Sequence, residues 1–427
     1  MSDPARRAAF ELLQAVSVDG AFANLRLPQL LTQHRLAGRD AALATELGYG
    51  AVRSTGTLDA VLAACSSRPL AQVDQRALDV LRLGAYQLLR TRIPPHAAVA
   101  TTVSLAREVG AGRASGFVNA VLRSVGRRDW DGWAAFLGRT DLERLALRTA
   151  HPQWIAVAFA DALGGDPTVA LEADDERPVT HLVAYPGCAD RAELGGEPGP
   201  WSPFAVRMAG GNPAALPAVR QHRAAVQDEG SQLCALALVR AQVDGRDERW
   251  LDLCAGPGGK SALLAALAAQ RGAAVSANEL RPHRAELVRQ ATARWDVPVR
   301  VGDARDYPDG DFDRILVDAP CTGLGALRRR PEARWRRDPA DVPELAALQR
   351  ELLGAALERV RPGGVVAYVV CSPHPAETRD VVAGHPLLDA RPLFAPVPEL
   401  GDGPTVQLWP HRHGTDAMFC AVVRRPA

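Results

Sequence analysis

One run of residues, 251–260, constrains the fold of this chain more than any other stretch. Residues 250–253 are a short apolar run typical of a buried strand, glycines follow within 256–259, and residues 261–269 read as an apolar helix. Proteins of the α/β class hold anionic or nucleoside ligands on a strand, a glycine loop and a helix in this order, because glycines let backbone approach closely and the helix N-terminus offers N–H groups. A simple tight turn is the alternative.

Three further features favour a ligand site over a turn. Glu279 ends a second apolar run about twenty positions after the loop, where a carboxylate can accept hydrogen bonds from a ribose. Asp303 ends a third short run. Lys260 is the only lysine in a chain whose Lys and Arg residues total 50, which indicates a position that needs a compact ammonium rather than a guanidinium. Chance survival of one lysine is the alternative.

The composition sets limits on domain number, partners and compartment. With 427 residues the chain is too long for one ordinary core, so two or three domains are expected. The net charge is only +1, so any surface that binds nucleic acid has to be local. Seven scattered cysteines without a CxxC pair or zinc spacing favour a reducing cytoplasm and no metal, and no signal peptide or membrane span is evident. We expect a cytoplasmic monomer.

Residues 1–128 are predicted to form an all-helical domain. Apolar residues recur at helical spacing, and Asp74 is placed to cap a helix. Sixteen arginines stand against ten acidic residues within 1–130, a local net charge of +6, which suits binding to phosphate backbones. A helical packing domain with a solvated charged face is the alternative.

The rest of the chain divides into two predicted parts. Residues 129–245 mix helical segments with a strand-like run and predict a small α/β linker domain. Residues 246–427 alternate strands and helices, which predicts a parallel, doubly wound sheet. Ligands of such sheets bind beyond the carboxyl ends of the strands, where Asp318, Cys321 and Cys371 all fall. A single cysteine is more often a small buried hydrophobe, but two at neighbouring strand ends form a constellation.

Three motifs in the C-terminal part resemble those of the S-adenosylmethionine-dependent RNA 5-methylcytosine methyltransferases. They are the loop 252–260, Asp318-Ala319-Pro320-Cys321 and Cys371-Ser372-Pro373. Residues 117–123, ahead of such a domain, resemble the NusB-type RNA-binding domain carried by methyltransferases of the ribosomal RNA small-subunit methyltransferase B type. The resemblance implies a multidomain protein with a NusB-like all-α domain at 1–128, an RNA-contacting linker at 129–245 and a Rossmann-like methyltransferase domain at 246–427.

The resemblance also implies the reaction, a methyl transfer from S-adenosylmethionine to C5 of a cytosine in RNA, with 16S ribosomal RNA as the expected substrate and S-adenosylhomocysteine as the product. C5 is a poor nucleophile until a thiolate adds to C6. By resemblance Cys371 is that nucleophile and Cys321 assists release of the product. DNA cytosine methyltransferases attack instead with the cysteine of a Pro-Cys pair such as Pro320-Cys321, so the assignment of the two thiols stays open.

The remaining catalytic and cofactor residues follow from the same motifs. Asp318 is expected to hold the cytosine edge, and Lys260 to polarise the ring or orient Asp318. Glu279 is expected on the ribose of the cofactor and Asp303 beside its adenine. The complete set of expected cofactor-binding residues is Cys254, Ala255, Gly256, Pro257, Gly258, Gly259, Lys260, Glu279, Asp303 and Asp318.

A strongly basic segment follows the Pro-Cys motif. Residues 328–337 hold six arginines, one acidic residue and one tryptophan. Arginines can pair with phosphates and a tryptophan can stack on a base, so the segment is expected to clamp RNA near a base-flipping site, with a helix-end cluster as the alternative. The expected RNA-binding residues are Arg328, Arg329, Arg330, Arg334, Trp335 and Arg336.

Other functions remain open at this point. The same chemistry on transfer RNA is one alternative, and a non-catalytic RNA-binding ribosome-assembly factor is another. A nicotinamide-dependent Rossmann enzyme would lack its Gly-x-Gly-x-x-Gly spacing and leave both thiols unexplained. One departure from the family pattern is that the acidic pair that often follows Cys371-Ser372 is reduced here to Glu377 alone.

Overall fold

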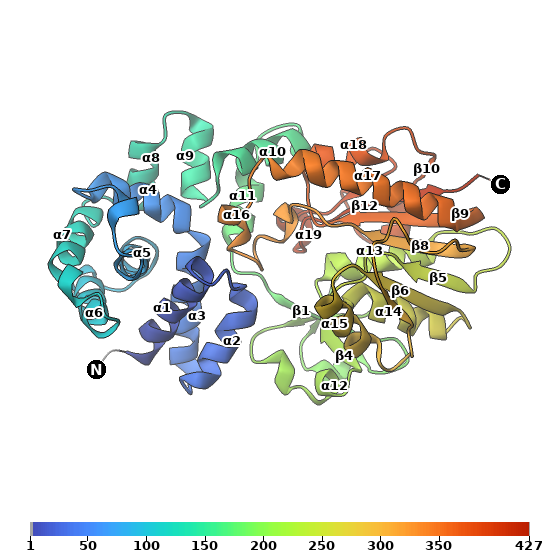
Figure 1. Ribbon diagram of the computed structural model, residues 1–427, viewed down its shortest axis with the longest axis horizontal. Coiled ribbons are helices and arrows are strands. Elements are labelled where there is room, and N and C mark those ends of the chain that lie inside the picture. The colour runs from blue at the N-terminus through green and yellow to red at the C-terminus, as the bar shows by residue number, and fades with distance from the viewer. Residues whose placement is uncertain (1–2, 427) are drawn as a thin grey trace. The chain divides into compact units, whose positions relative to one another are not determined.

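The computed structural model describes residues 3–426 and divides the chain into two compact units. The first comprises Met1–Glu176 together with Leu327–Asp338. The second comprises Arg177–Ala326 and Pro339–Ala427. Figure 1 labels the helices and strands of both units. Within the described part of the chain, no helix combines the length and the apolar character that a membrane crossing requires.

The first unit begins with a bundle of helices around one apolar core, as expected for an all-α domain. Asp74 caps one of them, because its carboxylate accepts hydrogen bonds from the backbone N–H groups of Arg76 and Ala77. The helices are α1 (Pro4–Ser17), α2 (Ala23–Gln33), α3 (Gly38–Arg53), α4 (Thr55–Cys65), α5 (Gln75–Arg90), α6 (Pro95–Glu108) and α7 (Ser115–Val125), with short η1 (Leu70–Gln72) and η2 (Gly112–Ala114).

Four more helices continue this unit up to its boundary at Glu176. The third starts at a Pro152 cap and ends at Gly164, whose left-handed backbone stops the helix. A short helix from the excursion Leu327–Asp338 belongs to the same unit. The helices are α8 (Trp130–Leu137), α9 (Asp141–Arg148), α10 (Gln153–Leu163), α11 (Thr168–Asp175) and α16 (Ala333–Arg336).

The second unit opens with a small antiparallel sheet in the order β2-β3-β1-β4. Its strands are β1 (Thr180–Ala184), β2 (Glu197–Pro198), β3 (Ala205–Met208) and β4 (Ala224–Val226), with η3 (Arg191–Leu194), η4 (Pro213–Ala215) and α12 (Pro217–Arg220) between them. The helical and the strand-forming halves of residues 129–245 thus belong to different compact units, and a separate linker domain stays a prediction.

The main sheet of the second unit has the order β10-β12-β9-β8-β5-β6-β7, with β11 paired to β12. The central run from β9 to β7 is parallel, and β12 joins β9 in antiparallel register. The strands are β5 (Arg249–Asp252), β6 (Ala274–Glu279), β7 (Val299–Val301), β8 (Phe312–Asp318), β9 (Val360–Val370), β10 (Leu387–Leu388), β11 (Val406–Gln407) and β12 (Phe419–Arg424). The predicted Rossmann-like fold is confirmed.

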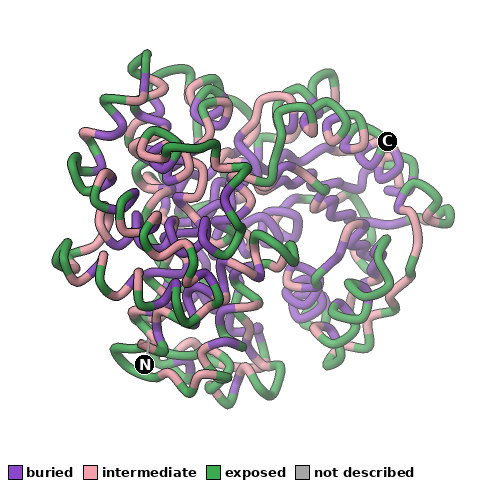
Figure 2. Tube along the Cα trace, turned by 60° about the vertical axis from the view of Figure 1, so that its left-hand side comes forward, coloured by how far each residue is buried: buried purple, intermediate pink, exposed green. Residues whose placement is uncertain are grey.

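Helices cover both faces of this sheet, because both sets of alternating side chains are apolar. Leu316 of β8 packs with α13 (Glu229–Arg240) and α14 (Gly259–Ala269), whereas Ile315 and Val317 pack with α17 (Asp341–Arg359). Figure 2 colours the buried residues of the chain purple along the Cα trace. The remaining elements are α15 (Pro282–Thr292), α18 (Arg379–Val382), α19 (Pro410–His413), η5 (Leu324–Ala326), η6 (Pro375–Glu377) and η7 (Arg391–Phe394).

The direction of winding reverses at the centre of the sheet. The chain runs outward from β5 through β6 to β7, then returns to β8 on the other side of β5 and continues to β9. Connections that leave adjacent strands in opposite directions open a crevice at the carboxyl ends of those strands. The loops after β5, β8 and β9 are therefore the place to look for a site.

Candidate active site at the carboxyl ends of β5, β8 and β9

The glycine loop after β5 is shaped by close approach of the backbone to a carboxylate. Gly256 donates its backbone N–H to Oε2 of Glu279 at 3.0 Å, and a Cβ on Gly256 would lie only 2.1 Å from that oxygen. Gly258, which caps the start of α14, has φ +106°, a backbone conformation that residues other than glycine rarely adopt. The loop therefore requires glycine at both positions.

The two predicted cofactor acids differ in their surroundings. Glu279 ends β6 and is buried, and its Oε1 also accepts the backbone N–H of Arg281 at 2.8 Å. Asp303 follows β7 and is held by Arg305 through two side-chain hydrogen bonds, which lower the pKa of Asp303 to about 2. Glu279 thus ends β6, the neighbour of β5 in the sheet, and Asp303 follows β7, the next strand. Their contacts with ribose and adenine stay predictions.

Buried polar atoms without partners surround the same loop. Neither polar atom of the Gln227 side-chain amide has a hydrogen-bond partner among the described residues, and a Cβ on Gly259 would lie 3.8 Å from its nitrogen. Oδ1 of Asp252 is also unpartnered, and burial raises the pKa of Asp252 to about 7. Since buried polar groups are normally hydrogen-bonded, this setting fits a bound polar ligand. Gln227 is not among the residues expected from the sequence to hold the cofactor.

Lys260 and Asp318 form an ion pair across the switch point of the sheet. Nζ of Lys260, in the first turn of α14, donates to Oδ2 of Asp318 at the end of β8 at 2.7 Å. Burial opposes the charge on Lys260, but the carboxylate of Asp318 outweighs it and holds the pKa of Lys260 above its ordinary value. The ion pair fits the predicted role of the single lysine in orienting Asp318, and that role stays a prediction.

The two predicted catalytic cysteines lie in contact. Cys321 follows β8 and Cys371 follows β9, and because these strands are parallel neighbours, the two Sγ atoms are 3.5 Å apart. The hydrogen bond with Cys371, together with burial, raises the pKa of the Cys321 thiol well above its ordinary value. Negative charge on Cys371 also contributes to the raised pKa of Lys260.

The structure contradicts the RNA contact predicted for Arg334, at the centre of the arginine-rich segment. Arg334 has no exposed surface, and it donates hydrogen bonds to the carbonyl oxygens of Ala150 and Asp174 in the helical unit. Trp335 donates to the carbonyl oxygen of Arg53 at 2.8 Å, and its ring lies against Gly56. The prediction that Arg334 contacts RNA is therefore wrong, because its guanidinium is enclosed by protein.

The neighbours of Arg334 differ in their freedom to contact a ligand. Arg336 is exposed, but its guanidinium donates to the carbonyl oxygens of Val16 and Ala21. Arg328 is buried, Arg329 is half-buried and Arg330 is exposed. RNA binding by the exposed members of this segment stays a prediction.

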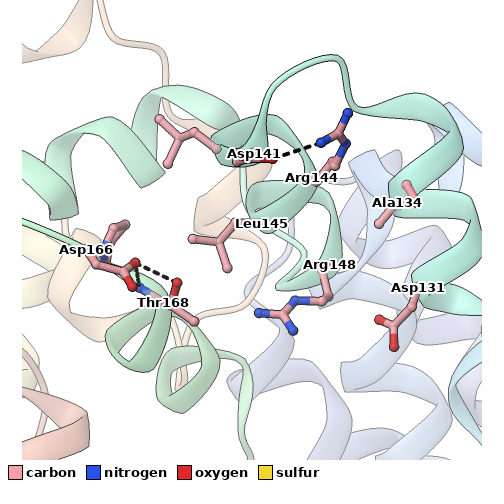
Figure 3. A pocket seen from close by; sticks show the side chains of 11 residues that line it. Asp131, Ala134, Asp141, Arg144, Leu145, Arg148, Asp166 and Thr168 are labelled. Atoms are coloured by element: carbon pink, nitrogen blue, oxygen red, sulfur yellow. Dashed lines mark hydrogen bonds and ion pairs between the residues drawn. The ribbon is translucent and has the colours of Figure 1, made fainter.

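A pocket in the helical unit offers a second place to look for a ligand (Figure 3). It encloses about 440 Å³ and is lined by residues of α8, α9 and α11 and the turn before α11. Its two arginines pair within the unit, since Arg144 bonds Asp141 at 2.8 Å and Arg148 bonds Glu172 at 2.7 Å. No group of three His, Cys, Asp or Glu side chains within residues 3–426 is arranged to hold a metal ion. We therefore place the chemistry at the strand ends of the second unit.

Comparisons with known proteins agree with this fold. The family model described as 16S rRNA methyltransferase RsmB/F matches residues 241–424, and the NusB family model matches residues 3–127. A candidate methyltransferase of Mycobacterium tuberculosis strain H37Rv is 57% identical over 99% of this chain and 97% of its own length. The probable ribosomal RNA small subunit methyltransferase B of Bacillus subtilis is 32% identical over 98% of both chains.

Solved structures extend the agreement to the whole fold. The crystal structure of PH0851 superimposes with a TM-score of 0.83 at 22% identity, covering 100% of this chain and 99% of the other. A methyltransferase homologue from Pyrococcus horikoshii matches 67% of this chain and 100% of its own length with a TM-score of 0.54. With the sequence relatives covered almost end to end, the chain belongs to the RsmB/F family of 16S ribosomal RNA methyltransferases with an N-terminal NusB domain, and it is an S-adenosylmethionine-dependent RNA methyltransferase.

Proposed function

We propose that this protein methylates C5 of a cytosine in 16S ribosomal RNA through a covalent bond between Cys371 and C6 of the base. The observation that carries the proposal is the pair of thiols 3.5 Å apart at neighbouring strand ends, at the same edge of the sheet as the Lys260–Asp318 ion pair. The names of the relatives, ribosomal RNA small subunit methyltransferase B, support ribosomal RNA as the substrate. We expect the reaction to take place in the cytoplasm.

The cofactor site would be built from the loop 254–260, Glu279, Asp303 and Asp318. Bound there, S-adenosylmethionine supplies an electrophilic methyl group. We add Gln227 to the residues that would hold it, because its unpartnered amide offers both a donor and an acceptor beside Gly259. An amino-acid group, with one carboxylate and one ammonium, matches this pair of functions.

The chain's own residues divide the work on the base. The Cys371 thiolate adds to C6, which moves electron density to C5 and makes that carbon nucleophilic. Asp318 accepts a hydrogen bond from the exocyclic amine of the cytosine, and Lys260 holds Asp318 in place. After methyl transfer a base removes the C5 proton, and elimination of the Cys371 thiolate restores the aromatic ring. Cys321, whose Sγ lies 3.5 Å from that of Cys371, would accept or relay that proton.

The helical unit would hold the RNA through its phosphates. Many of its arginines are exposed, among them Arg107, Arg113 and Arg123 around the end of α6 and α7. Phosphate contacts release counterions, so binding through these arginines should weaken steeply as salt is added.

Bisulfite sequencing of ribosomal RNA from a deletion strain tests the proposal. We expect one 5-methylcytosine of 16S ribosomal RNA to disappear, to return with the wild-type gene, and to stay absent with a Cys371→Ala gene. An unchanged 16S methylation pattern would contradict the ribosomal substrate, and loss of a transfer RNA 5-methylcytosine instead would identify the alternative substrate.

A further inference from the structure

The contact between the two thiols depends on loops that have no regular secondary structure of their own. Cys321 and Cys371 both lie beyond their strands, in segments whose backbone the sheet does not fix. A reaction that needs two sulfur atoms at one base needs those loops held together. Glu377, which the catalytic steps above leave unused, is buried with no exposed surface beside them.

We propose that Glu377 is a positioning residue that ties the Cys321 loop to the Cys371 loop and sets the separation of the two thiols. Its Oε1 accepts the backbone N–H of Thr322 at 2.7 Å, and its Oε2 accepts the hydroxyl of Ser372 at 2.6 Å. Each donor belongs to the residue that directly follows a cysteine. One carboxylate therefore bridges the two loops next to the thiols.

Further bonds close this bridge into a network. The Thr322 hydroxyl donates to Oε2 of Glu377 and lies 3.2 Å from the Ser372 hydroxyl. The backbone N–H of Gly325 donates to the carbonyl oxygen of Cys371 at 2.9 Å, which ties the loops a second time. The carboxylate of Glu377 thus accepts hydrogen bonds from both loops at once.

A second layer fixes Glu377 itself. Gln349 of α17 donates from Nε2 to Oε1 of Glu377 at 3.1 Å and to the carbonyl oxygen of Pro320 at 2.9 Å. Tyr368 of β9 donates its hydroxyl to the backbone carbonyl of Glu377 at 2.7 Å. Because a helix and a strand hold both the carboxylate and its backbone, the bridge is rigid enough to define a distance between sulfur atoms.

None of these bonds goes to a thiol, so Glu377 positions the thiols through the loops, while its charge adds to the effect of the Cys371 hydrogen bond and burial in raising the pKa of Cys321. The chemical role assigned to the thiols rests on the proposed function, whereas the geometric role of Glu377 does not. The test therefore needs a readout of the distance between sulfur atoms that is independent of methylation.

Disulfide formation supplies that readout. Diamide, an azo oxidant, takes two electrons and two protons from a pair of nearby thiols and leaves a disulfide, at a rate that depends on how readily the sulfur atoms meet. Cys234 and Cys420 form a second buried pair, so the Cys321–Cys371 disulfide has to be quantified by peptide mass mapping. The Cys234–Cys420 pair then serves as an internal reference in the same molecule.

We expect Glu377→Gln to slow formation of the Cys321–Cys371 disulfide, and Glu377→Ala to slow it more. Glutamine keeps one acceptor oxygen and the side-chain volume, whereas alanine removes every side-chain bond of the bridge. In the same variants kcat for methylation should fall by roughly 100-fold for alanine, the effect of misplacing a reacting group by about 1 Å. Cofactor affinity should stay at the wild-type value, because Glu377 lies outside the glycine loop.

Asp313→Asn is the matched control. Asp313 is a buried carboxylate at the start of β8 that also accepts two backbone N–H bonds, from Glu248 and Arg249, at the strand end far from the thiols. This variant should lose stability without changing the disulfide rate. A wild-type disulfide rate in Glu377→Gln and Glu377→Ala would overturn the proposal. A slowed rate supports it even if Cys371→Ala proves to methylate RNA, a result that would contradict only the two-thiol mechanism.

Discussion

The Cys321 loop and the segment Leu327–Asp338 lie only a few residues apart in the chain, yet they belong to different compact units. Both stretches carry residues that the sequence predicts to act on RNA, Cys321 in catalysis and the arginines in binding. Cys321 and Cys371 meet because parallel strands bring their carboxyl ends to one edge. The centre of the arginine-rich segment is instead enclosed in the helical unit. Topology is thus a firmer guide to a site than local charge density.

Arg334 illustrates why charge density misleads. Burial lowers the pKa of its guanidinium to about 10, while the carboxylates of Asp174 and Asp175 act to raise it. Its hydrogen bonds go to backbone carbonyl oxygens. A guanidinium with five donors can saturate such oxygens at the ends of helices, so an arginine in a one-signed run can be a structural connector.

The largest effect is expected at the nucleophile. Cys371→Ala removes the group that adds to C6, so methylation should fall by about 10⁴-fold or more, as for other enzymes that lose a nucleophile. Single-turnover assays with labelled cofactor measure this loss. Arg330→Ala, in the exposed part of the arginine-rich segment, should leave the single-turnover rate at saturating RNA close to wild type. Equal losses of single-turnover rate in Cys371→Ala and Arg330→Ala would contradict the assignment of catalysis to the Cys321 and Cys371 loops alone.

The next effect concerns stability. Arg334→Ala leaves the buried carboxylate of Asp174 without its guanidinium partner, whereas Asp175 keeps its ion pair with Arg90, so the free energy of unfolding of the helical unit should fall by about 3–5 kcal/mol. Arg330→Ala removes the same charge from an exposed position and should change it by less than about 0.5 kcal/mol. Urea denaturation followed by circular dichroism gives both values. Equal stabilities for the two variants would mean that Arg334 is no connector.

A smaller effect is expected in the cofactor loop. Glu279→Ala removes the acceptor for the backbone N–H of Gly256 and the expected acceptor for the ribose. Cofactor binding should weaken by about 1–3 kcal/mol, the range for leaving a buried polar partner unpaired. Isothermal titration calorimetry measures this change, and an unaltered affinity would refute the role of Glu279.

The smallest effect is a pH dependence in the helical unit. Burial and the charge of Arg334 lower the pKa of His151 below its ordinary value of 6.5. The unfolded chain therefore takes up a proton at His151 at a higher pH than the folded chain, and stability should be lost as pH falls below about 6.5. His151→Gln should flatten the dependence of unfolding free energy on pH between about 7 and 5. A curve that keeps its wild-type slope would assign the acid sensitivity to other groups.

The sequence predicts the parts of this molecule that depend on local pattern and strand order. The glycine loop, Lys260, Asp318 and the two cysteines could be named because they follow strands whose carboxyl ends share one edge. The burial of Arg334 could not be predicted, because its partners Ala150 and Asp174 lie more than a hundred residues away in the chain.

The bridge formed by Glu377 and the unpartnered amide of Gln227 could not be predicted either, because both depend on residues that lie far apart in the chain. Glu377 appeared in the sequence only as the remnant of an acidic pair, and its bonds to Thr322 and Gln349 depend on how three elements pack. Gln227 comes next to the loop from a different sheet. Long-range packing of single polar residues leaves no periodic signal in a sequence.

The central claim is that Cys371 attacks and Cys321 acts after methyl transfer. A denaturing gel of the Cys321→Ala and Cys371→Ala variants, each incubated with RNA and cofactor, tests this assignment most directly. Cys321→Ala should still form the bond to C6 but stall before elimination, so a slowly reversed protein–RNA band should accumulate, while Cys371→Ala should give no such band. A covalent band with Cys371→Ala and none with Cys321→Ala would contradict the account and make Cys321 the nucleophile.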